Sequence, residues 1–164
     1  MTTNKWGPVT WIFLHTFVAQ IKDELFTEAF PQIFILIRNI CLHLPCPECA
    51  QHAKEFFGKV NPGNIKNRYD IIDLLFAMHN IVNKRLYKPQ FNRQNMRFYR
   101  SLGVIVTYND FAKKYNTQGN MNLMTDEFHR QKVLRMVHQW LRTHIHYFNP
   151  PMTGDNITVD VDKL

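Results

Sequence analysis

Apolar side chains recur every three or four residues in four stretches of the first ninety or so residues, and this spacing limits the fold more than any other feature. Proline and glycine interrupt the chain between the stretches, notably at Pro45, Gly58 and Pro62. The sequence therefore predicts four short helices at residues 9–23, 32–43, 46–57 and 70–86. Helices of this length joined by short turns favour an all-α fold in which the four pack as a compact bundle.

The chain changes character beyond this bundle. Residues 101–108 (SLGVIVTY) contain a β-branched run that could form a short strand, and a turn of helix fits almost as well. Residues 116–124 read as a polar loop, and residues from 150 onward read as a tail. Residues 127–148 return to helical spacing with an apolar stripe and several arginines. Packing on the bundle, dimerisation and docking of a partner are all open roles for this last helix.

Composition places the chain among globular proteins, because 45% of its 164 residues are apolar. We expect one domain at residues 1–98 and a mainly helical C-terminal extension at residues 99–164. No apolar run approaches the ~20 residues that cross a bilayer, and the N-terminus lacks a secretory leader, so we expect no membrane span and no secretory signal. The net charge of +7 suits an anionic partner, but the basic residues are scattered and no nucleic-acid motif is recognisable, so specific nucleic-acid binding is not expected.

Residues 44–49 read LPCPEC, which places two cysteines three positions apart. The first backbone amides of a helix have no partner within the helix, so a proline, which lacks an amide hydrogen, is well tolerated there. We therefore expect the third helix to begin at Pro47, with Cys46 near the N-cap and Cys49 in the first turn. The unpaired amides and the helix dipole favour negative charge there, which lowers the pKa of a thiol. The C-x-x-C spacing also closes a small ring, which favours a catalytic dithiol and disulfide over a structural bridge.

A zinc site is the alternative interpretation of the same residues. The four ligands would be Cys46, Cys49, His52 and either His43 or Cys41. Structural zinc sites usually take a second ligand pair from a separate segment, and the sequence offers none. A metal-binding interaction module is therefore the second interpretation, and Cys41 by itself fits a buried free thiol. A thioredoxin-type oxidoreductase fits least, because that fold needs a β-α-β pattern.

Three motifs occur in a fixed order within about ninety residues. They are WGPVTWIFLH at 6–15, LPCPEC at 44–49 and MHNIVNKRLYKPQF at 78–91. The ordered trio resembles the Erv/ALR family of FAD-linked sulfhydryl oxidases, with its pattern of W-x-x-x-H, then C-x-x-C, then H-N-x-V-N. The short chain, which lacks the added cysteine pairs and targeting segments of cellular members, is similar to the virus-encoded branch of that family.

The resemblance implies a four-helix bundle that cradles FAD beside a disulfide formed by the catalytic residues Cys46 and Cys49. By the same resemblance, Cys49 is the thiol next to the flavin, and Cys46 exchanges with the substrate. Residues four apart share a helix face, and buried histidine or asparagine needs a hydrogen-bond partner, so a polar ligand between two helices explains the implied positions. The implied cofactor-binding residues are Gly7, Trp11, His15, His79, Asn80, Asn83, Lys84 and Lys88. The lysines would neutralise the FAD pyrophosphate, and the glycine would let the backbone pass close to the cofactor. No metal is implied.

The resemblance also implies the reaction and its partners. Electrons would pass from a substrate dithiol to the cysteine pair, then to FAD, and then to molecular oxygen to give hydrogen peroxide. The expected substrate is a thiol-containing protein, and because the chain has no distal shuttle pair of its own, we expect a relay protein with its own C-x-x-C. A homodimer is expected as well. Without a secretory signal, disulfide formation in virion proteins at an assembly site in the host cytoplasm is the expected setting, with the virion as a second location.

The sequence departs from the family pattern at two points. Leu74 stands where many cellular members have a tryptophan, so the adenine would be held differently. A family aromatic beyond the third motif has no clear counterpart. Phe98 and Tyr99 are the nearest substitutes, and both are left out of the expected site.

Overall fold

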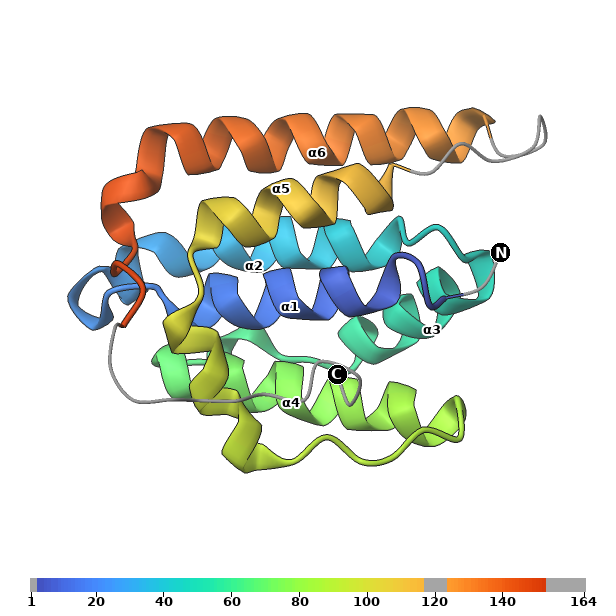
Figure 1. The fold of residues 1–164 in the computed structure, drawn as a ribbon, viewed down its shortest axis with the longest axis horizontal. Coiled ribbons are helices and arrows are strands. Elements are labelled where there is room, and N and C mark those ends of the chain that lie inside the picture. The colour runs from blue at the N-terminus through green and yellow to red at the C-terminus, as the bar shows by residue number, and fades with distance from the viewer. Residues whose placement is uncertain (1–2, 117–123, 153–164) are drawn as a thin grey trace.

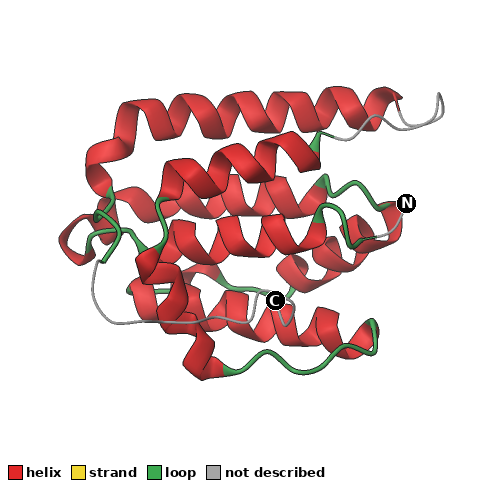
Figure 2. Cartoon of the chain, in the orientation of Figure 1, coloured by secondary structure: helices red, strands yellow, loops and turns green. Residues whose placement is uncertain are grey.

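The computed structural model describes residues 3–116 and 124–152. Within these residues the fold is all helical, which confirms the predicted all-α class, and no strand is formed (Figure 2). The α-helices are α1 (Gly7–Ala19), α2 (Phe26–Leu42), α3 (Pro47–Gly58), α4 (Arg68–Arg85), α5 (Val104–Tyr115) and α6 (Met124–His144). Three 3-10 segments lie between helices, namely η1 (Asp23–Leu25), η2 (Pro62–Asn64) and η3 (Arg93–Ser101), and a fourth, η5 (Ile145–Tyr147), follows α6.

The predicted helix ends differ most from the observed ends in the first two helices. The first helix ends at Ala19 instead of residue 23, because Ile21 forms an isolated antiparallel bridge with Phe148 and so leaves the helical conformation. The second helix begins at Phe26, earlier than the predicted residue 32, and carries Pro31 near its start. A proline there removes one backbone hydrogen bond, which the packing of the helix outweighs. Both α3 and α4 lie within two residues of their predicted bounds.

Residues 101–108 do not form a strand, so that alternative is wrong. They lead into α5, for which Gly103 is the N-cap. The buried residues of α5 recur every three or four positions, at Val104, Thr107, Tyr108, Phe111 and Tyr115. This packing decides in favour of a helix despite the β-branched run. The predicted loop and the predicted tail fall largely on residues 117–123 and 153–164, which lie outside the described residues.

The central helix is α1, which contacts α4, α5 and η3. At one edge of the molecule, α6 runs along α5 and contacts α2 (Figure 1). Eight of the thirteen residues of α1 are buried, because neighbours cover it on several sides and no face is left for polar side chains. Of the three roles open to the helix predicted at 127–148, the structure shows packing on the bundle.

Backbone hydrogen bonds join the end of the C-terminal extension to the end of α1. The Lys22 amide donates to the Tyr147 carbonyl at 2.9 Å, and the Asn149 amide donates to the Gln20 carbonyl at 2.6 Å. One cluster of buried apolar residues includes side chains from α1, α2 and α4 together with side chains from α5 and α6. The extension therefore shares the hydrophobic core of the bundle.

One segment of the described residues, Asp23–Leu42, is long and apolar enough to cross a membrane when judged by length and composition alone. About 39% of its most apolar window is buried inside the structure. Core helices of water-soluble proteins pass the same test. The expectation that the chain has no membrane span therefore stays a prediction.

Tyr87 has a backbone φ of 55°, and it follows the C-cap of α4. This left-handed conformation disfavours any residue with a Cβ atom, and the side chain is 97% exposed, so burial offers no compensation. We expect Tyr87→Gly to raise the free energy of unfolding by up to about 1 kcal/mol in urea titrations. Leu86→Gly is the matched control, because Leu86 has an ordinary φ of −87° and its replacement should lower stability. A stability loss in Tyr87→Gly would contradict this prediction.

Candidate functional site

The first turn of α3 carries the two neighbouring cysteines as a disulfide. Cys46 is the N-cap residue in an extended conformation, Pro47 occupies the first helical position, and Cys49 lies in the first turn, as predicted. The Cα atoms of the two cysteines are 5.1 Å apart, and the Cys49 amide donates a hydrogen bond to the Cys46 sulfur at 3.2 Å. Both residues are half-buried. The sulfurs are thus bonded to each other at a position where backbone amides favour a thiolate.

The interpretation of these residues as a zinc site gains no support from the geometry. No group of three or more metal-binding side chains occurs within residues 3–116 and 124–152. The two sulfurs that would ligate zinc are joined to each other, and metal ligation needs free thiolates. Cys41 is free and buried in α2, where burial raises the pKa of its thiol to about 12.

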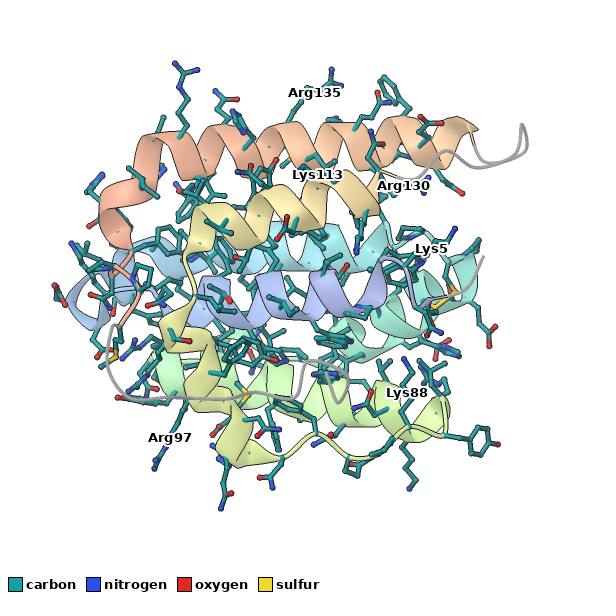
Figure 3. All side chains as sticks on the ribbon, in the orientation of Figure 1. Lys5, Lys88, Arg97, Lys113, Arg130 and Arg135 are labelled. Carbon is teal, nitrogen blue, oxygen red and sulfur yellow. A yellow bond between two sulfur atoms is a disulfide. The ribbon has the colours of Figure 1, made fainter. Side chains whose placement is uncertain are left out.

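A cavity of about 660 Å³ opens beside the disulfide, between α1, α3 and α4. This volume falls within the range of roughly 300–1,000 Å³ that is typical of cofactor sites. Seven of the ten predicted site residues line it, namely Gly7, Trp11, Cys46, Cys49, His79, Asn83 and Lys88. Figure 3 shows Lys88 at the end of α4 on the same side of the molecule as α3. His15, Asn80 and Lys84 do not line the cavity.

Aromatic rings form one wall of the cavity. Trp11 and His79 stack with their ring centres 4.1 Å apart and their planes at 7°. Behind them lies His15, which is fully buried, and its Nε2 is 3.0 Å from Nδ1 of His79. The ring of His15 also stacks on Tyr99 at 4.7 Å. The predicted pair on α1 is therefore split, because Trp11 faces the cavity and His15 supports the wall from behind.

Both histidines are held in the neutral form. Burial, and then the neighbouring His79, keep the pKa of His15 well below its usual value. Burial, and then the positive charge of Lys88, lower the pKa of His79 to about 4. The wall of the cavity therefore presents the uncharged imidazole of His79 at neutral pH, backed by a second uncharged imidazole from His15.

Acidification is expected to destabilise the protein through this pair. The unfolded chain binds protons on these histidines near pH 6.5, whereas folded His79 does so only near pH 4. Since the unfolded state binds more protons in this interval, the free energy of unfolding should fall as the pH drops from about 6.5 towards 4. Urea titrations between pH 7.5 and 4.5 should show a shallower pH dependence for His79→Gln than for the wild type. His138→Gln, at an exposed site, is the control, and an unchanged slope in His79→Gln would refute the expectation.

The asparagines of the third motif organise the chain that follows α4. The side-chain oxygen of Asn80 accepts from the Phe91 amide at 2.7 Å, and its amide donates to the Phe91 carbonyl at 3.3 Å. The amide of Asn83 donates to the Pro89 carbonyl at 3.1 Å. Asn80 thus bonds to the backbone of the segment that follows α4. Asn83 also bonds to this segment, and in addition it lines the cavity. Lys84 is exposed outside the cavity.

Trp6 begins the first motif but was not among the predicted site residues. Its side chain lines the cavity and is only 5% exposed, and its buried Nε1 has no hydrogen-bond partner in the protein. A buried indole N–H normally finds an acceptor, so a bound group is the natural partner. The signal available in the sequence was a tryptophan directly before the first helix, although helical periodicity does not reach that position.

Gly7 also lines the cavity, at the start of α1. Its φ is not positive, and an added Cβ would meet its nearest neighbour, Thr3, only at 4.0 Å. The chain itself therefore does not require glycine at this position. The close approach of the Gly7 backbone to a cofactor therefore stays a prediction.

Together these features define a class of protein, a helical bundle with a C-x-x-C disulfide at a helix N-terminus beside a cavity of cofactor size. The sequence profile of the Erv1 / Alr family matches residues 8–101. This match spans more than half of the chain, and the chain belongs to the Erv1 / Alr family. The matched residues include the disulfide, α1 from its second residue onward, α4 and η3, and they end before α5.

Relatives come from plants and from viruses. The chain is 35% identical over 96 residues to the FAD-linked sulfhydryl oxidase ERV1 of Oryza sativa subsp. japonica, covering 58% of this chain and 49% of the relative. It is 34% identical over 86 residues to the putative FAD-linked sulfhydryl oxidase 096R of Invertebrate iridescent virus 3, covering 52% and 58%. It is 36% identical over 83 residues to an FAD-linked sulfhydryl oxidase of African swine fever virus, covering 51% and 69%.

The chain thus spans about half the length of the first two of these relatives. No solved structure matches the chain.

Proposed function

We propose that this chain is an FAD-dependent sulfhydryl oxidase that forms disulfides in substrate proteins. The observation that carries the proposal is the placement of the Cys46–Cys49 disulfide and an aromatic wall on one cavity. A disulfide at a helix N-terminus supplies the exchange chemistry, and the cavity supplies room for a planar cofactor. The names of the relatives, which are FAD-linked sulfhydryl oxidases, agree with this combination.

The cavity residues fit FAD in three respects. The stacked rings of Trp11 and His79 offer a flat aromatic surface for the ring system of a cofactor. The unpartnered Nε1 of Trp6 offers a donor for a polar ligand atom. Lys88 offers a positive charge for the pyrophosphate at the exposed rim. When bound, FAD supplies the acceptor that takes an electron pair from the dithiol and passes it to molecular oxygen, giving hydrogen peroxide.

The cysteines carry the steps that the protein itself performs. A substrate thiolate attacks the Cys46 sulfur, which breaks the bond to Cys49 and forms a mixed disulfide. The Cys49 thiolate that leaves is stabilised by the N-terminus of α3. A second substrate thiol then attacks the mixed disulfide, so that the substrate departs oxidised and the cysteine pair is left reduced. We place Cys49 next to the flavin, so Cys49 would be the cysteine that hands the electron pair to bound FAD.

The physiological setting is part of the same proposal. The substrate is a thiol-containing protein, and a relay protein with its own C-x-x-C is the proposed donor. The relatives from an iridovirus and from African swine fever virus support a viral role. We therefore propose disulfide formation in virion proteins at an assembly site in the host cytoplasm, with the virion as a second location. A homodimer is also proposed, and sedimentation of the purified protein tests it.

The decisive test is the visible absorption spectrum of the purified chain, followed by oxygen uptake after a dithiol is added. A yellow protein that bleaches with dithiol and consumes oxygen is the expected result. A colourless protein that contains zinc would overturn the proposal and would restore the metal-binding interpretation of Cys46, Cys49 and His52.

A further inference from the structure

His15 has one polar contact in the structure, although it lies at the centre of the fold. Its side chain is fully buried, and its Nε2 is 3.0 Å from Nδ1 of His79. Its other nitrogen, Nδ1, is buried without a partner. The rings of Tyr99 and Phe91 stack on it at 4.7 Å and 5.7 Å, and a close-packed aromatic site holds His15 in one orientation.

A hydrogen bond between two neutral imidazoles needs one donor and one acceptor. If His79 donated, then His15 would carry its proton on Nδ1, and that buried N–H would lack an acceptor. If His15 donates from Nε2, its unpartnered Nδ1 is only an acceptor. Buried N–H groups without a partner are rarer in proteins than under-used acceptors. The second arrangement is therefore favoured, and it leaves the proton of His79 on Nε2.

The nitrogen that remains free on His79 is then the one available to the cavity. His79 lines the cavity, and its Nδ1 is engaged by His15. Because the pKa of each ring is low, neither imidazole takes up an additional proton at neutral pH. The group that results is a neutral N–H donor with a fixed direction, set in the wall beside Trp11.

We propose that His15 is a positioning residue which holds His79 in the tautomer protonated on Nε2, so that His79 donates a hydrogen bond to an oxygen or nitrogen acceptor of the cofactor. This proposal rests on the proposed function for the identity of the cofactor. The tautomer itself depends only on the two histidines and their surroundings. His15 acts through His79, because it does not line the cavity itself.

The test uses the full chain as purified, labelled with ¹⁵N, and long-range ¹H–¹⁵N correlation spectra of the imidazoles at pH 7. A spectrum of His79→Phe identifies the His79 signals by their loss. We expect wild-type His79 to carry its proton on Nε2. His15→Gln keeps an N–H donor at the position of Nε2 and should preserve this tautomer. His15→Phe keeps a ring but no donor, so His79 should populate both tautomers.

FAD affinity is the second measurement on the same variants. Loss of one oriented donor should weaken FAD binding about tenfold in His15→Phe, while His15→Gln should stay within about threefold of the wild type. Wild-type His79 protonated on Nδ1 would overturn the proposal, as would unchanged tautomer and affinity in His15→Phe. If His15→Phe fails to fold, the wild-type and His15→Gln spectra still decide the matter. A chain that binds no FAD would refute the proposed function, while the spectra would still report whether His15 sets the tautomer.

Discussion

Cys49→Ser is expected to abolish oxygen consumption with a dithiol substrate while the protein stays folded and yellow. Serine is close to cysteine in size, and the residue is half-buried at the wall of the cavity, so the cofactor site keeps its shape. The serine hydroxyl cannot form a disulfide with Cys46 and does not ionise to a nucleophile near neutral pH. The path of electrons from substrate to cofactor is therefore broken. Oxygen uptake should fall by at least about a thousandfold, since covalent catalysis is lost altogether. Activity is measured with an oxygen electrode, and bound flavin by absorbance.

Cys41→Ala is the control for this experiment. The Cys41 thiol is free and buried, and burial raises its pKa to about 12, so it supplies almost no thiolate at neutral pH. Its replacement should leave turnover within a few-fold of the wild type. A Cys49→Ser protein that retains full activity would remove Cys49 from the mechanism. Cys41 also lines the cavity, so a Cys41→Ala protein that loses its activity while it keeps bound flavin would show that the third cysteine takes part in electron transfer.

Helix positions could be predicted from periodicity, because a helix must bury one face against its neighbours. The α3 and α4 segments show this best, since a proline or an asparagine marks the start of each. The α5 segment could not be assigned, because its β-branched residues fit either a strand or a helix when taken alone. The contact of α5 with α1 decides the matter, and a contact between residues about a hundred positions apart leaves no local trace in the sequence.

In the site, too, local spacing predicts some features, and others depend on how the helices pack. Spacing of four residues correctly places Trp11 and His15 on neighbouring turns of one helix, but it does not say which of them faces the cavity. That depends on how α1 rotates against α4, which the rings of Phe91 and Tyr99 fix by packing against His15. For the same reason the sequence did not show that Asn80 pairs with the Phe91 backbone. The motifs therefore predict which residues lie near the site. The direction in which each side chain points depends on the packing of the helices.

Phe111→Ala is expected to lower the free energy of unfolding by about 3–5 kcal/mol, which is the usual cost of removing a buried phenylalanine ring. Phe111 lies on α5 beyond the family match, and it is fully buried. Its ring stacks on Phe13 of α1 at 4.9 Å and contacts Tyr115 at 4.7 Å. A loss of this size is a large share of the ~5–15 kcal/mol that stabilises a typical domain. Urea titration followed by circular dichroism provides the measurement.

The matched control is Val106→Ala on the same helix, where the side chain is 65% exposed. It should change stability by no more than about 0.5 kcal/mol. If Phe111→Ala destabilises the whole protein in one transition and releases flavin with it, then α5 is part of the cooperative core that holds α1 and its cavity wall in place. Two separate transitions, with flavin retained through the first, would mean instead that the extension unfolds independently of the bundle. The contacts of Phe111 with Phe13 favour the single transition, because Phe13 lies two residues from both Trp11 and His15 on the helix that positions the cavity wall.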